Sequence, residues 1–137
     1  MILKKNGTFI VIADDDAEDR EMLEEAMCLS GKMITTRAFD NGQQILDYLQ
    51  QLNGSGLPDA IVLDYSMPKL TGAQVLEKLA EDAKFSAIQK FVWSSSSSHI
   101  HVEECLRKGA MKYFTKPDSP AKLNAIAEEI LAACNKS

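Results

Sequence analysis

The sequence predicts an α/β fold in which five parallel strands form one doubly wound sheet. Short apolar runs rich in valine and isoleucine alternate with stretches of helical spacing, and this alternation occurs five times. Such alternation indicates a parallel sheet covered by helices on both faces, because each parallel pair of strands needs a crossover connection. The length of 137 residues suits a single domain over residues 1–137.

Each predicted strand is an apolar or β-branched run bounded by turn residues. Runs of this kind are typical of strands buried inside a parallel sheet. In chain order the five predicted strands are Thr8–Ala13, 33–39, 60–63, 90–93 and Lys112–Thr115.

The predicted helices are recognised by apolar stripes between and after these strands. The last stripe is the most regular and follows the i, i+3, i+4, i+7 rule from Leu123 to Cys134. The four earlier stripes are Met22, Leu23, Ala26 and Met27; Ile45, Leu46, Leu49 and Leu52; Val75, Leu76 and Leu79; and Val102, Cys105 and Leu106.

Helix boundaries are predicted from capping residues. Gly31 and Gly109 each follow a stripe, where a glycine of left-handed conformation is common. Side chains expected to cap helix N-termini are Asp16, Asn41 with Gln44, Thr71 with Gln74, and Ser119 before Pro120.

Composition excludes several classes of protein. The net charge is −5 with acidic and basic residues interspersed, which argues against a nucleic-acid-binding domain. No apolar stretch approaches the roughly 20 residues of a membrane span, and residues 1–5 are too short and polar for a signal peptide. Cys28, Cys105 and Cys134 lack zinc-site spacing and are expected to be buried thiols. We therefore expect a cytoplasmic protein without nucleic-acid or membrane partners.

Acidic residues end two of the predicted strands. Asp14 and Asp15 follow the first strand, and Asp64 follows the third. The carboxyl ends of neighbouring parallel strands share one crevice, where ligands bind, so these three carboxylates are expected to converge. Crowded carboxylates repel one another, and a hard cation such as Mg²⁺ removes that cost. The pattern predicts a magnesium site in which one carboxylate attacks phosphorus.

Two further residues follow the fourth and fifth strands. Ser94 places a hydroxyl that can donate a hydrogen bond to a phosphoryl oxygen. Lys116 can pair with a phosphate or with Asp64, and it precedes Pro117. A cis bond to that proline would bend the chain so that the lysine points inward. For each residue alone, a solvated surface position is the simpler alternative.

Taken together, these residues resemble the receiver domain of bacterial two-component response regulators. The resemblance covers nearly the whole chain and implies a flavodoxin-like (βα)5 fold, in a stand-alone domain like the chemotaxis regulators. The matching residues, in order, are Asp14-Asp15, the segment Leu63-Asp64-Tyr65-Ser66-Met67-Pro68 with Gly72, Ser94, Gly109-Ala110, Tyr113 and Lys116-Pro117. Ser94 and Lys116 have the family's usual separation, which selects Ser94 within the serine run.

The resemblance implies a role for each matching residue. Asp64 is the expected phosphoacceptor, and Asp14 and Asp15 are expected to hold Mg²⁺ with the backbone carbonyl of Ser66. Ser94 is the expected switch hydroxyl and Lys116 the expected phosphate contact. Tyr113 is the expected switch aromatic, whose rotamer follows Ser94.

The resemblance also implies partners. The phosphodonor would be a histidine kinase or a histidine phosphotransfer protein, and the signal would pass to an unidentified downstream protein. Lys108, Lys112 and Lys122 suggest a basic rim for a partly acidic partner, with a solvated surface as the alternative. The domain is expected to catalyse only its own phosphorylation and dephosphorylation.

Two departures and two alternatives accompany this interpretation. Serine stands at position 94 where threonine is commoner, and Trp93 is larger than the usual aliphatic residue. Strand alternation should point Trp93 away from Asp64 and toward a covering helix. One alternative is a receiver-like adaptor that is never phosphorylated. The other is a haloacid-dehalogenase-type phosphatase with Asp14 as nucleophile, although the chain has no room for a cap domain.

Overall fold

A computed structural model describes residues 7–134 of the chain. Its single sheet has five parallel strands in the order β2-β1-β3-β4-β5. The strands are β1 (Thr8–Ala13), β2 (Ile34–Phe39), β3 (Ala60–Asp64), β4 (Gln89–Ser94) and β5 (Lys112–Thr115). The five predicted strands are confirmed, with boundaries that differ by one residue at most. The predicted flavodoxin-like fold class is therefore confirmed.

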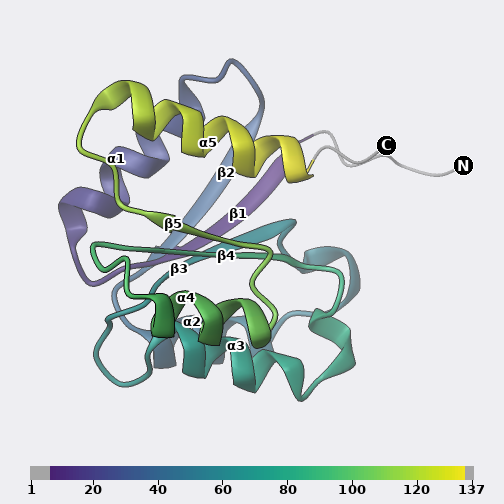
Figure 1. Cartoon of the computed structure of the whole chain (residues 1–137). Helices are drawn as coiled ribbons and strands as arrows, with labels where there is room; N and C mark the ends of the chain where they lie inside the picture. The colour runs from purple at the N-terminus through teal and green to yellow at the C-terminus, as the bar shows by residue number, and fades with distance from the viewer. Residues whose placement is uncertain (1–6, 135–137) are drawn as a thin grey trace, which may run out of the picture.

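The helices cover both faces of the sheet (Figure 1). The α-helices are α1 (Ala17–Cys28), α2 (Gly42–Gln50), α3 (Gly72–Ala80), α4 (His99–Arg107) and α5 (Pro120–Cys134). Two 3-10 turns, η1 (Gly54–Gly56) and η2 (Ala83–Phe85), precede β3 and β4. α1 and α5 lie on one face, and α2, α3 and α4 lie on the other. No helix within residues 7–134 combines the length and apolarity needed to cross a membrane.

Two apolar cores separate the sheet from its helices because strand residues alternate between its faces. In β1, Val11 and Ala13 pack toward α2, α3 and α4, whereas Ile10 and Ile12 pack toward α1 and α5. β3 is buried along its whole length. This burial explains why its sequence is continuously apolar up to Asp64 rather than alternating.

Most predicted helix caps are confirmed. Asp16 accepts a hydrogen bond from the Asp19 backbone N–H at 3.1 Å, and Thr71 forms a complete capping box with Gln74. Asn41 accepts from the Gln44 backbone, but the return bond is not among those of the described residues. Gly31 and Gly109 have φ values of 80° and 113°, the left-handed conformation that favours glycine.

Some predicted core residues lie at the surface. Met22 and Leu106 are 45% and 46% exposed, although both belong to predicted apolar stripes. The prediction of buried thiols holds for Cys105, is wrong for Cys28, which is exposed, and Cys134 is half-buried. The stripes are broader than the face that each short helix buries against the sheet. Residues 1–5, which we interpreted as no signal peptide, lie outside the described residues.

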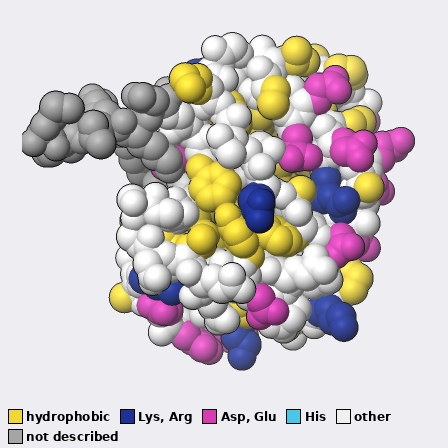
Figure 2. All heavy atoms as spheres, turned by 180° about the vertical axis from the view of Figure 1, so that it is seen from behind, with side chains coloured by type: hydrophobic (Ala, Val, Ile, Leu, Met, Phe, Trp, Pro, Cys, Tyr) yellow, Lys and Arg dark blue, Asp and Glu magenta, His cyan; other side chains and the backbone are white. Residues whose placement is uncertain are grey.

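Charges on the surface are mixed in sign. Seen from the side opposite Figure 1, acidic and basic side chains are interspersed around an apolar centre (Figure 2). On that face no basic stripe of the kind that follows a nucleic-acid backbone is visible.

Candidate functional site

The predicted site residues occupy the carboxyl ends of four strands. Asp14 follows β1, Asp64 ends β3, Ser94 ends β4 and Lys116 follows β5. The parallel register aligns these ends, since Ala13 pairs with Leu63, Asp64 with Trp93 and Ser94 with Thr115. Side chains from four distant stretches of sequence are thereby brought to one edge of the sheet.

Three carboxylates form the centre of the site. Asp14, Asp15 and Asp64 each place an oxygen within 4.8 Å of the others. Asp14 is fully buried and Asp64 is 5% exposed, whereas Asp15 is exposed. The predicted convergence is confirmed, and the arrangement crowds like charges in a place that water barely reaches.

The donor set suits a hard divalent cation. Asp14 Oδ1 accepts a hydrogen bond from the Asp16 backbone N–H at 2.9 Å. Asp14 Oδ2 is fully buried and accepts no aligned hydrogen bond from the described residues. A buried carboxylate oxygen without a hydrogen bond is costly, and carboxylate oxygens are the ligands that Mg²⁺ prefers. Asp14, Asp15 and Asp64 therefore fit a magnesium site.

Lys116 lies among these carboxylates. Its Nζ is 2.8 Å from Asp14 Oδ2, 2.8 Å from Asp19 Oδ2 and 3.2 Å from Asp64 Oδ2. The lysine reaches inward with a trans bond to Pro117, because residues 7–134 contain no cis peptide bond. The cis bond suggested from the sequence is wrong, and the strand end itself aims Lys116 at the site.

The electrostatics of the site are strongly perturbed. Burial, reinforced by the negative charge of Asp14, raises the pKa of Asp64 from 3.8 to about 7 against the opposing effect of Lys116. Burial lowers the pKa of Lys116, but the close contacts of Asp14 and Asp19 and the charge of Asp64 outweigh it and raise that pKa overall. The lysine stays charged, and Asp64 carries the cost of the crowding.

The segment after Asp64 is held by backbone contacts. The Ser66 N–H donates to Asp64 Oδ1 at 3.2 Å, and the Gly72 N–H donates to the Tyr65 carbonyl at 2.9 Å. A Cβ on Gly72 would lie 2.7 Å from the Asp64 carbonyl oxygen. Position 72 must therefore be glycine for α3 to begin this close to the site.

Ser94 and Tyr113 belong to one hydrogen-bonded chain. Ser94 Oγ accepts from the Ser96 N–H at 3.2 Å, and the Tyr113 hydroxyl donates to the Ser96 carbonyl at 2.8 Å. Ser94 is 2% exposed, and Tyr113 packs against the core that contains α4. The two predicted switch residues are thus linked through the loop between β4 and α4.

Comparison with known proteins identifies the family. The family model of the response regulator receiver domain matches residues 10–128. The chain belongs to this family. The Arabidopsis thaliana response regulators ARR15 and ARR7 are 33% and 30% identical to it over 130 and 129 residues. Each match covers 89% of this chain and 62% of the relative, so the chain spans about three fifths of the length of those regulators.

Solved structures of response regulators share the fold. The phosphorylated cyanobacterial phytochrome response regulator RcpA superimposes with a TM-score of 0.82 at 24% identity, covering 90% of this chain and 91% of that one. The receiver domain of the Mycobacterium tuberculosis regulator NarL gives 0.79 at 23% identity, covering 96% and 100%. Relatives include plant and bacterial proteins, so the bacterial branch expected from the sequence stays a prediction.

Sequence reasoning missed two features of this receiver domain. Asp19, on the first turn of α1, is the third carboxylate around Lys116. Tyr65 donates its hydroxyl to Glu104 at 2.7 Å and stacks on His101 of α4, with ring centroids 3.9 Å apart. Asp19 is one of several acidic residues on α1, and no local pattern distinguishes it from the rest.

The orientation predicted for Trp93 is half right. Trp93 packs toward α1 and α5, as expected. However, its register partner is Asp64, and partners on neighbouring strands point to the same face, so it does not point away from that residue. Lys116 Nζ lies 5.2 Å from the centre of the Trp93 ring. Alternation within one strand does not show which residues of the next strand share its face.

The basic rim suggested for the output face is already neutralised within the domain. Lys108 pairs with Glu104 and Glu77, Lys112 with Glu129, and Lys122 with Asp118. These pairs leave little excess positive charge for an acidic partner, so that interpretation was wrong. α4 instead exposes an apolar side chain, Ile100, which is 77% accessible.

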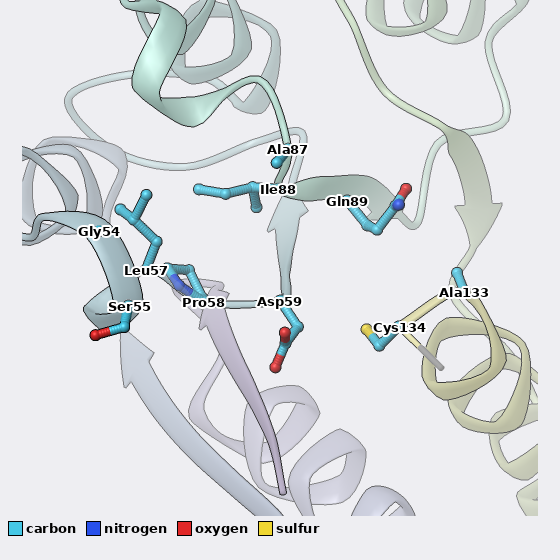
Figure 3. Close-up of a pocket in the computed structure, with 10 residues that line it drawn as sticks. All are labelled: Gly54, Ser55, Leu57, Pro58, Asp59, Ala87, Ile88, Gln89, Ala133 and Cys134. Atoms are coloured by element: carbon cyan, nitrogen blue, oxygen red, sulfur yellow. The ribbon is translucent and has the colours of Figure 1, made fainter. Parts of the chain in front are cut away.

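A separate pocket lies at the opposite end of the sheet (Figure 3). It is formed by residues that precede β3 and β4 and by the end of α5, among them Pro58, Asp59, Gln89 and Cys134. Asp59 Oδ2 accepts a hydrogen bond from the Phe9 N–H at 2.8 Å, which ties β1 to the start of β3. This pocket is a full strand length away from the carboxylate cluster.

Proposed function

We propose that this receiver domain accepts a phosphoryl group on Asp64 and signals through phosphorylation-dependent protein–protein contacts. The observation that carries the proposal is the convergence of Asp14, Asp15 and Asp64 within 4.8 Å of one another, with Lys116 against two of them. A buried nucleophile, a cation site and a fixed ammonium are what acyl phosphate formation requires.

In the proposed reaction, an Asp64 carboxylate oxygen attacks the phosphorus of the donor. The bond between phosphorus and the donor's imidazole nitrogen breaks, and the freed imidazole takes up a proton. Asp14, Asp15, Asp64 and the Ser66 carbonyl would hold Mg²⁺, which when bound offsets the carboxylate charge and polarises the phosphoryl oxygens. Rcp1, a relative of known structure, was crystallised in a Mn²⁺-bound form, and RcpA in a phosphorylated form, which supports both parts.

Lys116 and Ser94 would stabilise the product. The Lys116 ammonium, already 3.2 Å from Asp64 Oδ2, would pair with a phosphoryl oxygen. The Ser94 hydroxyl would donate to another oxygen, which draws on the loop that also binds Tyr113. A phosphoryl group adds a charge of roughly −1.5 to −2, so a small repacking of this loop and α4 would carry the signal.

The proposed partners are a phosphodonor and a downstream protein. The donor would be a histidine kinase or a histidine phosphotransfer protein in the cytoplasm. The downstream protein would contact the face formed by α4, β5 and α5, whose conformation the Tyr113 hydrogen bond links to the site. The domain would have no enzymatic activity beyond its own phosphorylation and dephosphorylation.

Phosphorylation is tested with Mg²⁺ and acetyl phosphate. We expect the intact mass to rise by one phosphoryl group, and peptide mapping to place the group on Asp64. Asp64→Asn should not label, whereas the exposed-site variant Asp47→Asn should label as the wild type does. Labelling on Asp14 instead would favour the phosphatase alternative, and failure to label with any donor would favour the adaptor.

The output route is tested with a beryllium fluoride phosphoryl mimic and Mg²⁺. Hydrogen exchange should change around Tyr113 and across residues 98–125 as well as in the loop after Asp64. Changes confined to that loop would defeat the proposed route. A Ser94→Ala variant should bind the mimic and lose the distant changes.

A further inference from the structure

Asp19 occupies a position that the proposed chemistry does not yet use. It lies in the first turn of α1, and its side chain is 25% exposed. Its Oδ2 accepts a hydrogen bond from Lys116 Nζ at 2.8 Å. The contact joins two segments that are 97 residues apart in the sequence, across the mouth of the site.

Lys116 is surrounded by as many carboxylates as it has protons to donate. An ammonium group has three N–H donors. Its neighbours are Asp14 and Asp19, both at 2.8 Å, and Asp64 at 3.2 Å. Two of these three neighbours, Asp14 and Asp64, belong to the proposed magnesium site, whereas Asp19 does not belong to it.

We propose that Asp19 is a positioning residue that anchors Lys116 while Asp14 turns to the metal. The inference rests on the proposed phosphorylation site. When Asp14 Oδ2 exchanges the lysine for a cation, Lys116 keeps Asp19 and Asp64 as partners and has one donor free. That donor is then available to a phosphoryl oxygen, and the ammonium stays at the site rather than swinging into solvent.

Without Asp19, the lysine competes with the metal. Lys116 would retain only Asp14 and Asp64, and both are oxygens that the cation needs. Its side chain is 12% exposed, so water is a poor substitute for the lost carboxylate. Asp19→Ala should therefore weaken magnesium binding through Lys116, in addition to the smaller effect of removing a nearby negative charge.

Glu18 is a matched control for the charge effect. It precedes Asp19 in the same first turn, and both are acidic residues at the N-terminal end of α1. Removing either one costs a similar interaction with the helix dipole. Glu18 is exposed and has no contact with Lys116 among those of the described residues, so Glu18→Ala removes the charge without removing the anchor.

The test is a double-mutant cycle on Mg²⁺ affinity, measured by calorimetry. We expect Asp19→Ala to raise the dissociation constant roughly fivefold more than Glu18→Ala does, within the range of coupling for contacting charges. In a Lys116→Met background that excess should disappear. Fluorescence of Trp93, the sole tryptophan, gives a second readout where Lys116 is intact, because that lysine lies over its ring.

Each outcome decides the matter. Equal effects of Asp19→Ala and Glu18→Ala would overturn the inference, and so would an Asp19 effect that persists without Lys116. Should Asp19→Ala fail to fold, Asp19→Asn removes the charge and keeps an acceptor oxygen, with a smaller excess expected. Wild-type protein that binds no Mg²⁺ would instead overturn the proposed function, and the inference with it.

Discussion

Replacing Asp64 by asparagine should stabilise the metal-free domain, and more so at high pH. The carboxylate is buried beside Asp14, which raises its pKa from 3.8 to about 7. A group whose pKa is raised by folding binds more protons in the native state. Its contribution to stability is therefore greatest below pH 4 and is lost as the pH rises toward 7. Asparagine has the shape of the protonated acid and no titration.

The shift sets the magnitude of the effect. A difference of about three units corresponds to roughly 4 kcal/mol at pH 8, where Asp64 is ionised in both the native and the unfolded state. At pH 5 the same linkage gives roughly 1.6 kcal/mol, because the native carboxyl is then mostly protonated. The stability gained by Asp64→Asn should thus be larger at pH 8 than at pH 5 by roughly 2–3 kcal/mol.

Urea unfolding in the presence of a chelator measures this difference. The free energy of unfolding of wild type and Asp64→Asn is compared at both pH values, so that other titrating groups cancel. Asp47→Asn, which removes an exposed carboxylate of α2, should show little change at either pH. An Asp64→Asn domain that is less stable than wild type at pH 8, or a gain that does not grow with pH, would refute the reasoning. Saturating Mg²⁺ should reverse the order by stabilising only the wild type.

Three further predictions concern the same end of the sheet. Asp14→Asn combined with Asp15→Asn should abolish Mg²⁺ binding in calorimetry and leave the metal-free melting temperature equal or higher, because like charges are removed; a marked drop in melting temperature would contradict this. Gly72→Ala should lower the free energy of unfolding by roughly 1–3 kcal/mol, since its Cβ would lie 2.7 Å from a carbonyl oxygen. Gly56→Ala, where no atom lies within 4 Å, is the control and should cost little. Tyr65→Phe should cost about 1 kcal/mol and speed hydrogen exchange in α4, and unchanged exchange there would argue against a link between the site and that helix.

The sequence by itself determined the strands, the fold class and the candidate catalytic residues. Each was encoded locally: an apolar run marks a buried strand, and the residue that follows it lies at the edge where ligands bind. Asp14, Asp64, Ser94 and Lys116 could be found because each directly ends or follows such a run. Parallel connectivity alone then brings them together.

The tertiary structure alone decided the contacts between elements. Asp19 is one of several acids on α1, and only the packing of that helix beside β5 shows that it reaches Lys116. Trp93 shares a face with Asp64 because of the register between β3 and β4, which no single strand encodes. Contacts of this kind depend on the distances and angles between separate segments, whereas sequence patterns record only the environment along each segment.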